Sequence, residues 1–184
     1  MVPAQLPEAG GVSYPKLPAI RQAKTRPGYL HPATPTDIVE VIDALGDEVV
    51  YGLRSIELAQ ARPGTRGRLI FGSFALPDRI LLYEVRRPPW TIRASPDPTD
   101  IMRMTEAGAR VAAEPVAGVT TVEWPGETLK WFFLLDVLLH ELGHHHAQQY
   151  RRRFRSRALR TKDHEAYAQQ FARIHRRRLG STGS

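Results

Sequence analysis

Apolar and polar residues follow a helical period first and a strand period afterwards. Apolar positions recur at helical spacing from Thr36 or Asp37 onward, and Gly46 follows the last of them. This predicts a short helix that ends at the glycine. From residue 49 to 58 the chain is rich in β-branched and apolar residues, which predicts a strand.

Two further strands are predicted, over residues 68–76 and 79–85, with a turn at Pro77-Asp78 between them. Three consecutive strands joined by short turns indicate an antiparallel meander. A short helix is expected over residues 99–109. A weaker strand, residues 119–124, ends the β-rich part of the chain.

The pattern from Thr128 onward is helical, and it predicts one long helix of about 25 residues. A second helix begins at Thr161 or Asp163 and ends near Arg178. The predicted fold class is therefore α+β. An antiparallel sheet packs on the long helix, and a second helix completes the C-terminal part.

Prolines and glycines set the expected boundaries. Residues 1–36 contain seven prolines, which predicts an extended N-terminal arm. Residues 37–179 are expected to form one domain, and residues 180–184 a flexible tail.

Composition limits the chemistry that this chain of 184 residues can perform. It has no cysteine, which excludes disulfides, iron–sulfur centres and a thiol nucleophile. A metal must therefore be bound by histidines and carboxylates, and six of the seven histidines lie at or after His140. The most apolar stretch, residues 131–139, is shorter than the roughly 20 residues that span a membrane. No signal peptide is evident, so we expect a cytoplasmic protein without membrane contact.

The long helix contains the sequence His140-Glu141-Leu142-Gly143-His144, an HExxH motif. Positions i and i+4 of a helix lie on one face, so the two imidazoles can bind one zinc ion. Glu141 flanks that face and can reach a metal-bound water as a general base without being a ligand. The alternative is a solvated, histidine-rich helix face that binds metal adventitiously.

A catalytic zinc site needs a third protein ligand, and Glu165 is the best candidate. Ala168 and Ala172 follow it on the same face of the second helix. These small residues would let the two helices approach closely and bring the carboxylate to the metal. His164 and His175 are alternative ligands, and Glu165 could instead be an ordinary first-turn glutamate that the helix dipole favours.

The sequence His-Glu-Leu-Gly-His-His, followed by Glu-Ala-x-Ala-x-x-Phe-Ala, resembles the compact ImmA/IrrE-type metallopeptidases, which have the gluzincin arrangement. The resemblance covers roughly residues 128–175. It implies a minimal zincin-like fold, a Zn²⁺ cofactor bound by His140, His144 and Glu165, and Glu141 as the catalytic residue. It also implies peptide-bond hydrolysis in a protein or peptide substrate, which in this family is often a regulatory protein.

A hydrolytic site also needs a donor for the negative charge that develops on the former carbonyl oxygen. Five residues are candidates: Tyr167, His164, His145, His146 and His175. His145 and His146 are turned away from the zinc face by the helical period. We expect an extended substrate to pair with the strand at residues 119–124 if that strand is a sheet edge.

Asp136 lies one turn before His140 inside the apolar run, where an unpaired carboxylate is costly. It is expected either to accept a hydrogen bond from a ligand imidazole or to pair with an arginine from elsewhere, unless it is simply exposed.

The net charge is +7, and the segment from Tyr150 to Arg178 alone carries +9, from 11 basic and 2 acidic residues. The arginines at 151–157 and 176–178 could neutralise phosphates, with Phe154 stacking on a base. The alternative is a solvated positive surface that keeps the protein soluble or attracts acidic protein. The second hypothesis is therefore a nucleic-acid- or protein-binding module with a structural or inactive zinc site.

Overall fold

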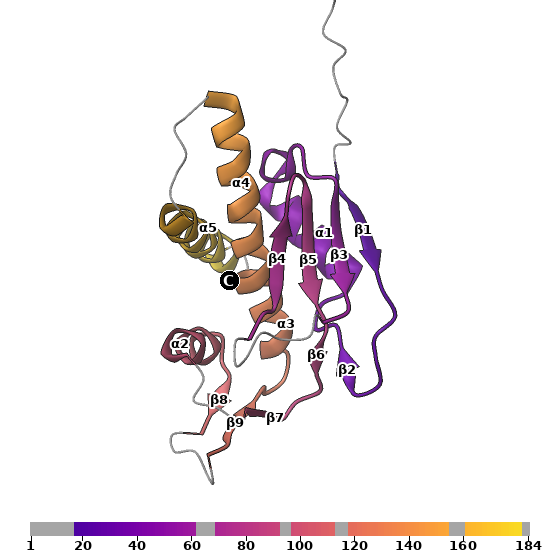
Figure 1. The fold of residues 1–184 in the computed structure, drawn as a ribbon, viewed down its shortest axis with the longest axis vertical. Helices are drawn as coiled ribbons and strands as arrows, with labels where there is room; N and C mark the ends of the chain where they lie inside the picture. The colour runs from indigo at the N-terminus through magenta and orange to yellow at the C-terminus, as the bar shows by residue number, and fades with distance from the viewer. Residues whose placement is uncertain (1–16, 62–68, 93–96, 113–117, 155–160, 182–184) are drawn as a thin grey trace, which may run out of the picture.

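The computed structural model describes residues 17–61, 69–92, 97–112, 118–154 and 161–181. The first sixteen residues of the predicted arm, and residues 182–184 of the predicted tail, lie outside this part of the chain. The fold is α+β (Figure 1). In chain order the elements are β1 (Ala19–Gln22), β2 (Tyr29–Leu30), α1 (Pro35–Leu45), the 3₁₀ helix η1 (Asp47–Val50), β3 (Ser55–Ala59), β4 (Gly72–Ala75), β5 (Arg79–Tyr83), β6 (Val85–Arg86), β7 (Trp90–Ile92), α2 (Pro98–Glu106), β8 (Arg110–Val111), β9 (Thr120–Glu123), α3 (Thr128–Phe132), the π-helical turn η2 (Phe133–Leu138), α4 (Leu139–Phe154) and α5 (Thr161–Ser181).

The main sheet has four strands in the order β1-β3-β5-β4. β1 and β3 are parallel, as are β3 and β5, and only β4 and β5 are antiparallel. The predicted antiparallel meander is therefore wrong, because β4 lies beyond β5 and the chain then turns back, so that β5 is inserted between β4 and β3 and runs parallel to β3. β4 consequently lies at one edge of the sheet.

The fourth strand, β1, comes from within the proline-rich residues 1–36. Its residues pair with β3, from Ala19 opposite Ser55 to Gln22 opposite Leu58. Prolines lie before and after this strand. They are compatible with it because β1 is the other edge strand of the sheet, and one side of an edge strand forms no hydrogen bonds to a neighbouring strand. The proline-rich segment thus contributes a strand to the sheet.

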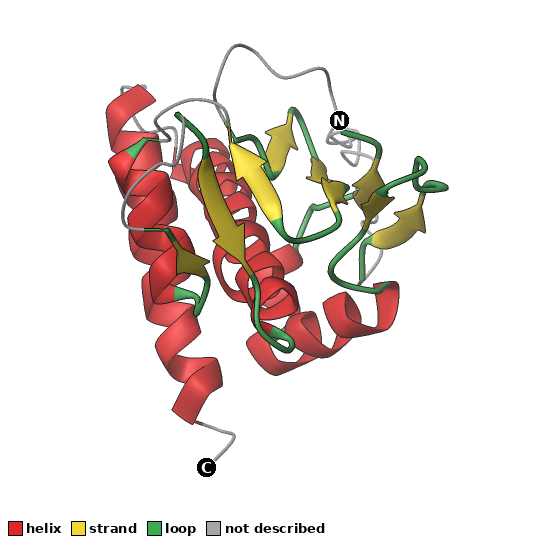
Figure 2. Ribbon diagram, turned by 90° about the horizontal axis from the view of Figure 1, so that it is seen from below, coloured by secondary structure: helices red, strands yellow, loops and turns green. Residues whose placement is uncertain are grey.

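One face of the main sheet is covered by helices (Figures 1 and 2). Strand alternation turns Ile56, Leu58, Ile80 and Leu82 to that face, and all four are buried. The apolar stripe of α1 is buried as predicted: Ile38, Val41, Ile42 and Leu45. The apolar residues of α3, η2 and α4 complete the same core.

Two predicted boundaries in the first half differ from the structure. α1 begins at Pro35 and is capped by Thr34, whose hydroxyl accepts the Asp37 N–H at 3.2 Å while the Asp37 carboxylate accepts the Thr34 N–H at 2.7 Å. Proline suits the first helical position because its missing N–H has no partner there. Residues 47–50 form η1, and the predicted strand at 49–58 begins only at Ser55.

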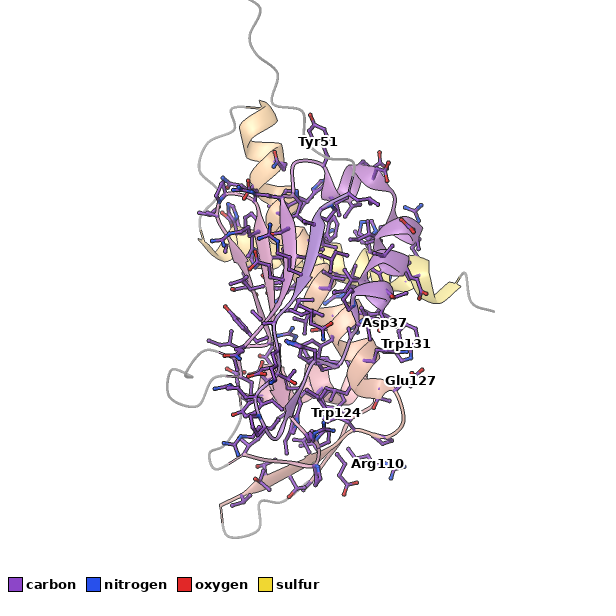
Figure 3. All side chains as sticks on the ribbon, turned by 90° about the vertical axis from the view of Figure 1, so that its right-hand side faces the viewer. Asp37, Tyr51, Arg110, Trp124, Glu127 and Trp131 are labelled. Atoms are coloured by element: carbon purple, nitrogen blue, oxygen red, sulfur yellow. The ribbon has the colours of Figure 1, made fainter. Side chains whose placement is uncertain are left out.

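Lys130 of α3 links the start of α1 to the long helix. Its ammonium lies 2.7 Å from Glu127 and 3.8 Å from Asp37. The Trp131 ring lies 5.1 Å from the Lys130 ammonium, on the surface where Asp37, Glu127 and Trp131 gather (Figure 3).

A separate three-stranded sheet has the order β7-β9-β8, and both of its pairings are antiparallel. β9 confirms the predicted weak strand, but it lies in the middle of its sheet. It therefore has no free edge, and the expectation that a substrate pairs with residues 119–124 is wrong.

The predicted long helix runs from Thr128 to Phe154, with the π-helical turn in its first half. π-Helical turns are rare and occur often at functional sites. The second helix, α5, continues to Ser181 and so includes the first two residues of the expected tail. None of the helices within the described residues has the length and apolar character that crossing a bilayer requires.

Glu84, which follows β5, binds Arg26 of the N-terminal segment. The residue is 2% exposed, and its carboxylate accepts the backbone N–H of Arg26 at 2.9 Å as well as the Arg26 guanidinium. Burial raises the pKa of Glu84, but hydrogen bonds from Arg26 and the Ala61 backbone outweigh burial and leave the pKa below its ordinary value of 4.5. Ionised Glu84 therefore stabilises the fold.

We predict that Glu84→Gln lowers the free energy of unfolding at pH 7 by about 1–3 kcal/mol, because a charge-assisted hydrogen bond is lost. Since the pKa of Glu84 is depressed in the fold, its contribution is present above pH 4.5 and is lost as the pH falls through the folded-state pKa. Urea unfolding at pH 7 and in acid should show the two proteins converging on acidification. Glu123→Gln, which changes an exposed residue, is the control. An equal loss of unfolding free energy in both variants would contradict the stabilising role assigned to the Glu84–Arg26 contact.

Candidate metal centre

The two histidines of the HExxH motif lie on one face of α4, as predicted. Their Nε2 atoms are 3.1 Å apart, and the ring centroids are 4.7 Å apart with the planes at 90°. Successive turns of one helix therefore present two ring nitrogens to the same point.

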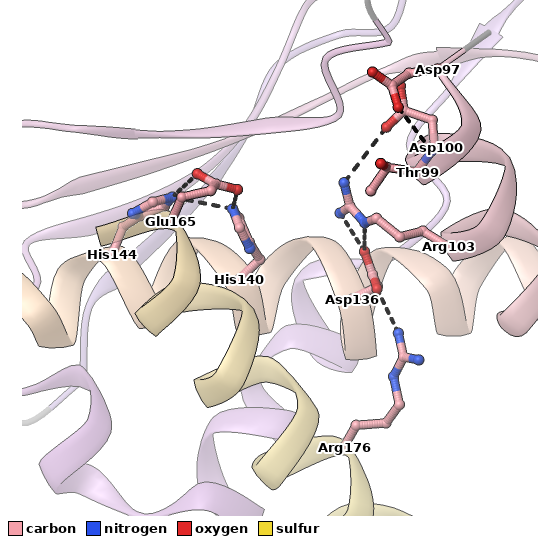
Figure 4. Close-up of polar contacts among 9 residues, drawn as sticks. All are labelled: Asp97, Thr99, Asp100, Arg103, Asp136, His140, His144, Glu165 and Arg176. Carbon is pink, nitrogen blue, oxygen red and sulfur yellow. Dashed lines mark hydrogen bonds and ion pairs between the residues drawn. The ribbon is translucent and has the colours of Figure 1, made fainter. Parts of the chain in front are cut away.

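Glu165 of α5 completes the group (Figure 4). Its Oε1 lies 3.3 Å from Nε2 of His140, and its Oε2 lies 3.5 Å from Nε2 of His144. Among the described residues, these three form the one group whose ligand atoms could hold a metal ion. His164 and His175, the alternative third ligands, are not part of it.

The spacing within this group fits zinc. Ligand atoms at about 2.0–2.2 Å from a tetrahedral zinc ion lie about 3.3–3.5 Å from one another. The observed separations of 3.1, 3.3 and 3.5 Å are close to this range. Two imidazole nitrogens and a carboxylate oxygen are also a donor set that zinc accepts.

The protonation of the histidines suits a metal as well. Burial and then the nearby His144 lower the pKa of His140 to about 4, although the charge of Glu165 opposes this. Burial also lowers the pKa of His144. Both imidazoles are therefore neutral at pH 7, which is the form that binds metal.

Close packing of α4 against α5 brings Glu165 to the histidines. A Cβ atom built on Gly143 would lie 2.7 Å from Cα of Ala168 and 3.1 Å from Cβ of Phe171. Ala168 and Ala172 are buried in the same interface. The predicted role of these small residues is confirmed, and the glycine inside the motif contributes to it.

Glu141 is 7% exposed and lies outside the ligand group. Its carboxylate accepts the backbone N–H of Phe74, on the edge strand β4. Burial raises the pKa of Glu141 to about 8, and the charge of Glu165 acts in the same direction. Gly72 makes room for this side chain, since a Cβ there would lie 3.1 Å from Cγ of Glu141.

Asp136 pairs with arginines from two other helices (Figure 4). Oδ1 accepts Nε of Arg103, from α2, at 2.9 Å, and Oδ2 accepts a terminal nitrogen of Arg176, from α5, at 2.6 Å. Arg176 also donates to the backbone carbonyl of Leu135 at 3.2 Å. The expectation of an arginine partner is confirmed. The second arginine could not be anticipated because nothing in sequence spacing places α2 beside η2.

The other histidines of the C-terminal half contact residues other than the ligand group. Nε2 of His145 lies 3.0 Å from the Tyr51 carbonyl oxygen, and Nδ1 of His146 lies 2.7 Å from the Tyr167 hydroxyl. The His175 ring centroid lies 4.3 Å from that of Phe171. Of the five candidates for charge stabilisation, His164 is the one whose charge acts on the ligand His144.

The side chains of residues 150–162 lie outside the described part of the chain, and with them the arginines at 151–157. Arg176 is held by Asp136, whereas Arg177 and Arg178 are exposed.

Comparison of the chain with protein-family models, with curated proteins and with solved structures finds no match.

We predict that Gly143→Ala weakens zinc binding by at least about tenfold. Alanine favours helix by roughly 1 kcal/mol over glycine, but its Cβ would push Ala168 away and move Glu165 off the histidines. Competitive zinc titration with a fluorescent chelator measures the effect. Ala166→Val, on the exposed side of α5, is the control, and an unchanged zinc affinity in Gly143→Ala would refute the close-packing argument.

We expect Asp136→Asn to lower the free energy of unfolding by about 1–3 kcal/mol, because two partly buried guanidinium groups lose their carboxylate. Urea unfolding of the metal-free proteins measures the effect. Asp43→Asn, which changes an exposed residue of α1, is the control. Equal stability of the two variants would show that the arginine pairs contribute little.

Proposed function

We propose that this protein is a zinc-dependent metallopeptidase with a zincin-like arrangement. The observation that carries the proposal is the group of His140, His144 and Glu165 at zinc-ligand spacing beside the buried carboxyl of Glu141. A site with three protein ligands and an open position is typical of catalytic rather than structural zinc. The proposal agrees with the resemblance to ImmA/IrrE-type metallopeptidases in the two motifs.

His140, His144 and Glu165 would hold the zinc ion, which supplies an activated water and a polarised carbonyl when it is bound. Glu141 accepts the proton that the attacking water loses and returns it to the leaving amine. Its pKa of about 8 lies close to neutral pH, so the group can both take up a proton and release it. The Phe74 N–H keeps the carboxyl facing the edge strand.

The edge strand β4 offers a place for an extended substrate. Because the Phe74 N–H reaches Glu141 and not β5, alternation along an antiparallel pair also turns the backbone groups of Gly72 outward. A peptide that adds to this edge would lie alongside α4 and the ligand group. This supports a protein or peptide substrate bound in extended conformation, such as a loop of a regulatory protein.

The nucleic-acid-binding alternative receives no support from a specific contact. The arginines at 151–157 have no described side chains, and Arg176 is held by Asp136. That alternative stays a prediction, which a titration with duplex DNA at two salt concentrations tests.

We predict that Glu141→Gln retains zinc but lowers kcat by at least about 100-fold, since it removes the proposed proton acceptor. Hydrolysis is followed with a randomised mixture of quenched fluorescent peptides, and bound metal is measured by elemental analysis. Glu106→Gln, on the exposed end of α2, is the matched control.

Two outcomes would count against the proposal. Full activity of Glu141→Gln would remove the assigned base. Unchanged zinc content in both His140→Ala and Glu165→Ala would remove the assigned metal site.

A further inference from the structure

A second concave site lies away from the ligand group, at the end of the main sheet where β3 and β5 begin. It is a cavity of about 310 Å³. Its lining comes from β1, β3 and the β4–β5 turn: Arg21, Arg54, Ser55, Glu57, Leu76, Pro77, Asp78 and Arg79. Three of these eight residues are arginines, and the proposed catalytic chemistry uses none of them.

Strand register explains why the arginines meet. Arg21 lies opposite Glu57, and Arg79 lies opposite Ser55. By strand alternation these residues share the face of the sheet that points away from the buried Ile56 and Ile80. Arg54 precedes β3, and its backbone N–H donates to the Asp78 carbonyl at 2.8 Å, which holds it against the β4–β5 turn.

The lining carries three arginines and two carboxylates, Glu57 and Asp78, so it keeps a net positive charge. Glu57 accepts a hydrogen bond from the Ser55 hydroxyl at 2.9 Å and lies 4.0 Å from Arg79. Within the described part of the chain, Arg21 and Arg54 form no ion pair. Two exposed guanidinium groups are thus available, and their planar shape suits a carboxylate.

The cavity begins where β4 ends. Leu76, Pro77 and Asp78 form the turn between β4 and β5 (Figure 1). Leu76 is 65% exposed. At about 3.3 Å per residue, the turn lies roughly 7–10 Å along the strand from Phe74, whose N–H contacts Glu141. A chain that follows the edge of β4 past Glu141 therefore reaches the turn that lines one side of the cavity, whereas Arg21 lies on the opposite edge strand, β1.

We propose that this cavity binds an acidic side chain of the peptide substrate, so that the enzyme selects substrates with a glutamate or aspartate a few residues from the scissile bond. The inference rests on the proposed function. Side chains of an extended peptide alternate between the two sides of the sheet. Those on the side of Ser73 and Ala75 point towards the face that carries the arginines.

Binding is tested without catalysis, on metal-free protein, by fluorescence anisotropy of labelled hexaglutamate and hexaglutamine peptides. The wild type should bind hexaglutamate more tightly, and added salt should weaken the binding. Arg21→Ala with Arg54→Ala should reduce the affinity for hexaglutamate by about tenfold or more. Arg110→Ala, on β8, is the control that removes a distant arginine.

Glu57→Gln gives a test of opposite sign, in case the double variant does not fold. Removing this carboxylate should tighten hexaglutamate binding severalfold, because a like charge is lost from the cavity. Equal affinity of the wild type for both peptides, or an unchanged affinity in Glu57→Gln, would overturn the proposal.

Cleavage is measured separately on zinc-loaded protein. Charge-dependent binding without hydrolysis of any peptide would support the acidic site and contradict the proposed peptidase. Hydrolysis without any preference for acidic peptides would support the peptidase and contradict the acidic site.

Discussion

The close approach of α4 and α5 at Gly143 and Ala168 is the constraint on which the candidate site depends. No single helix can place three ligand atoms around one point at zinc spacing, because the helical period brings only positions one turn apart to the same face. The third atom must come from another helix, and only the absence of a side chain on Gly143 lets the backbone of α5 come near enough. The glycine therefore acts through packing on the ligand geometry.

Ion pairs at Asp136 also hold α5 against the long helix, one turn before the HExxH motif. Asp136 lies one turn before His140 and is bonded by arginines of α2 and α5. α5 is thus fixed at three points along its length: Glu165 at the ligand group, Ala168 at the glycine and Arg176 at the carboxylate. The Asp136 contacts fall within the π-helical turn, where the helical hydrogen-bond pattern widens just before the motif.

The mixed sheet matters because it decides which backbone edge faces the helix. Since β5 turns back from β4 and pairs in parallel with β3, β4 is left as the edge strand, and it supplies the Phe74 N–H to Glu141. Parallel pairing of β1, β3 and β5 brings Arg21, Arg54 and Arg79 together beside the β4–β5 turn, at the end of the sheet where these strands begin. The β4–β5 turn therefore connects the strand that contacts Glu141 to one side of the cavity.

Local information in the sequence was enough to predict the helices, the shared face of the HExxH histidines and the role of the small residues of α5. Periodicity and motif spacing are properties of one element and can be read from its own residues. The sequence also indicated that Asp136 needs a partner. Strand direction, the position of β9 inside its sheet and the recruitment of residues 19–22 into β1 depend on pairing between distant segments, for which one sequence has no local signal. The same is true of the two arginines on Asp136 and of the cavity at Arg21, Arg54 and Arg79. Residue types determined which chemistry this chain could support, and only tertiary packing decided which of those residues meet.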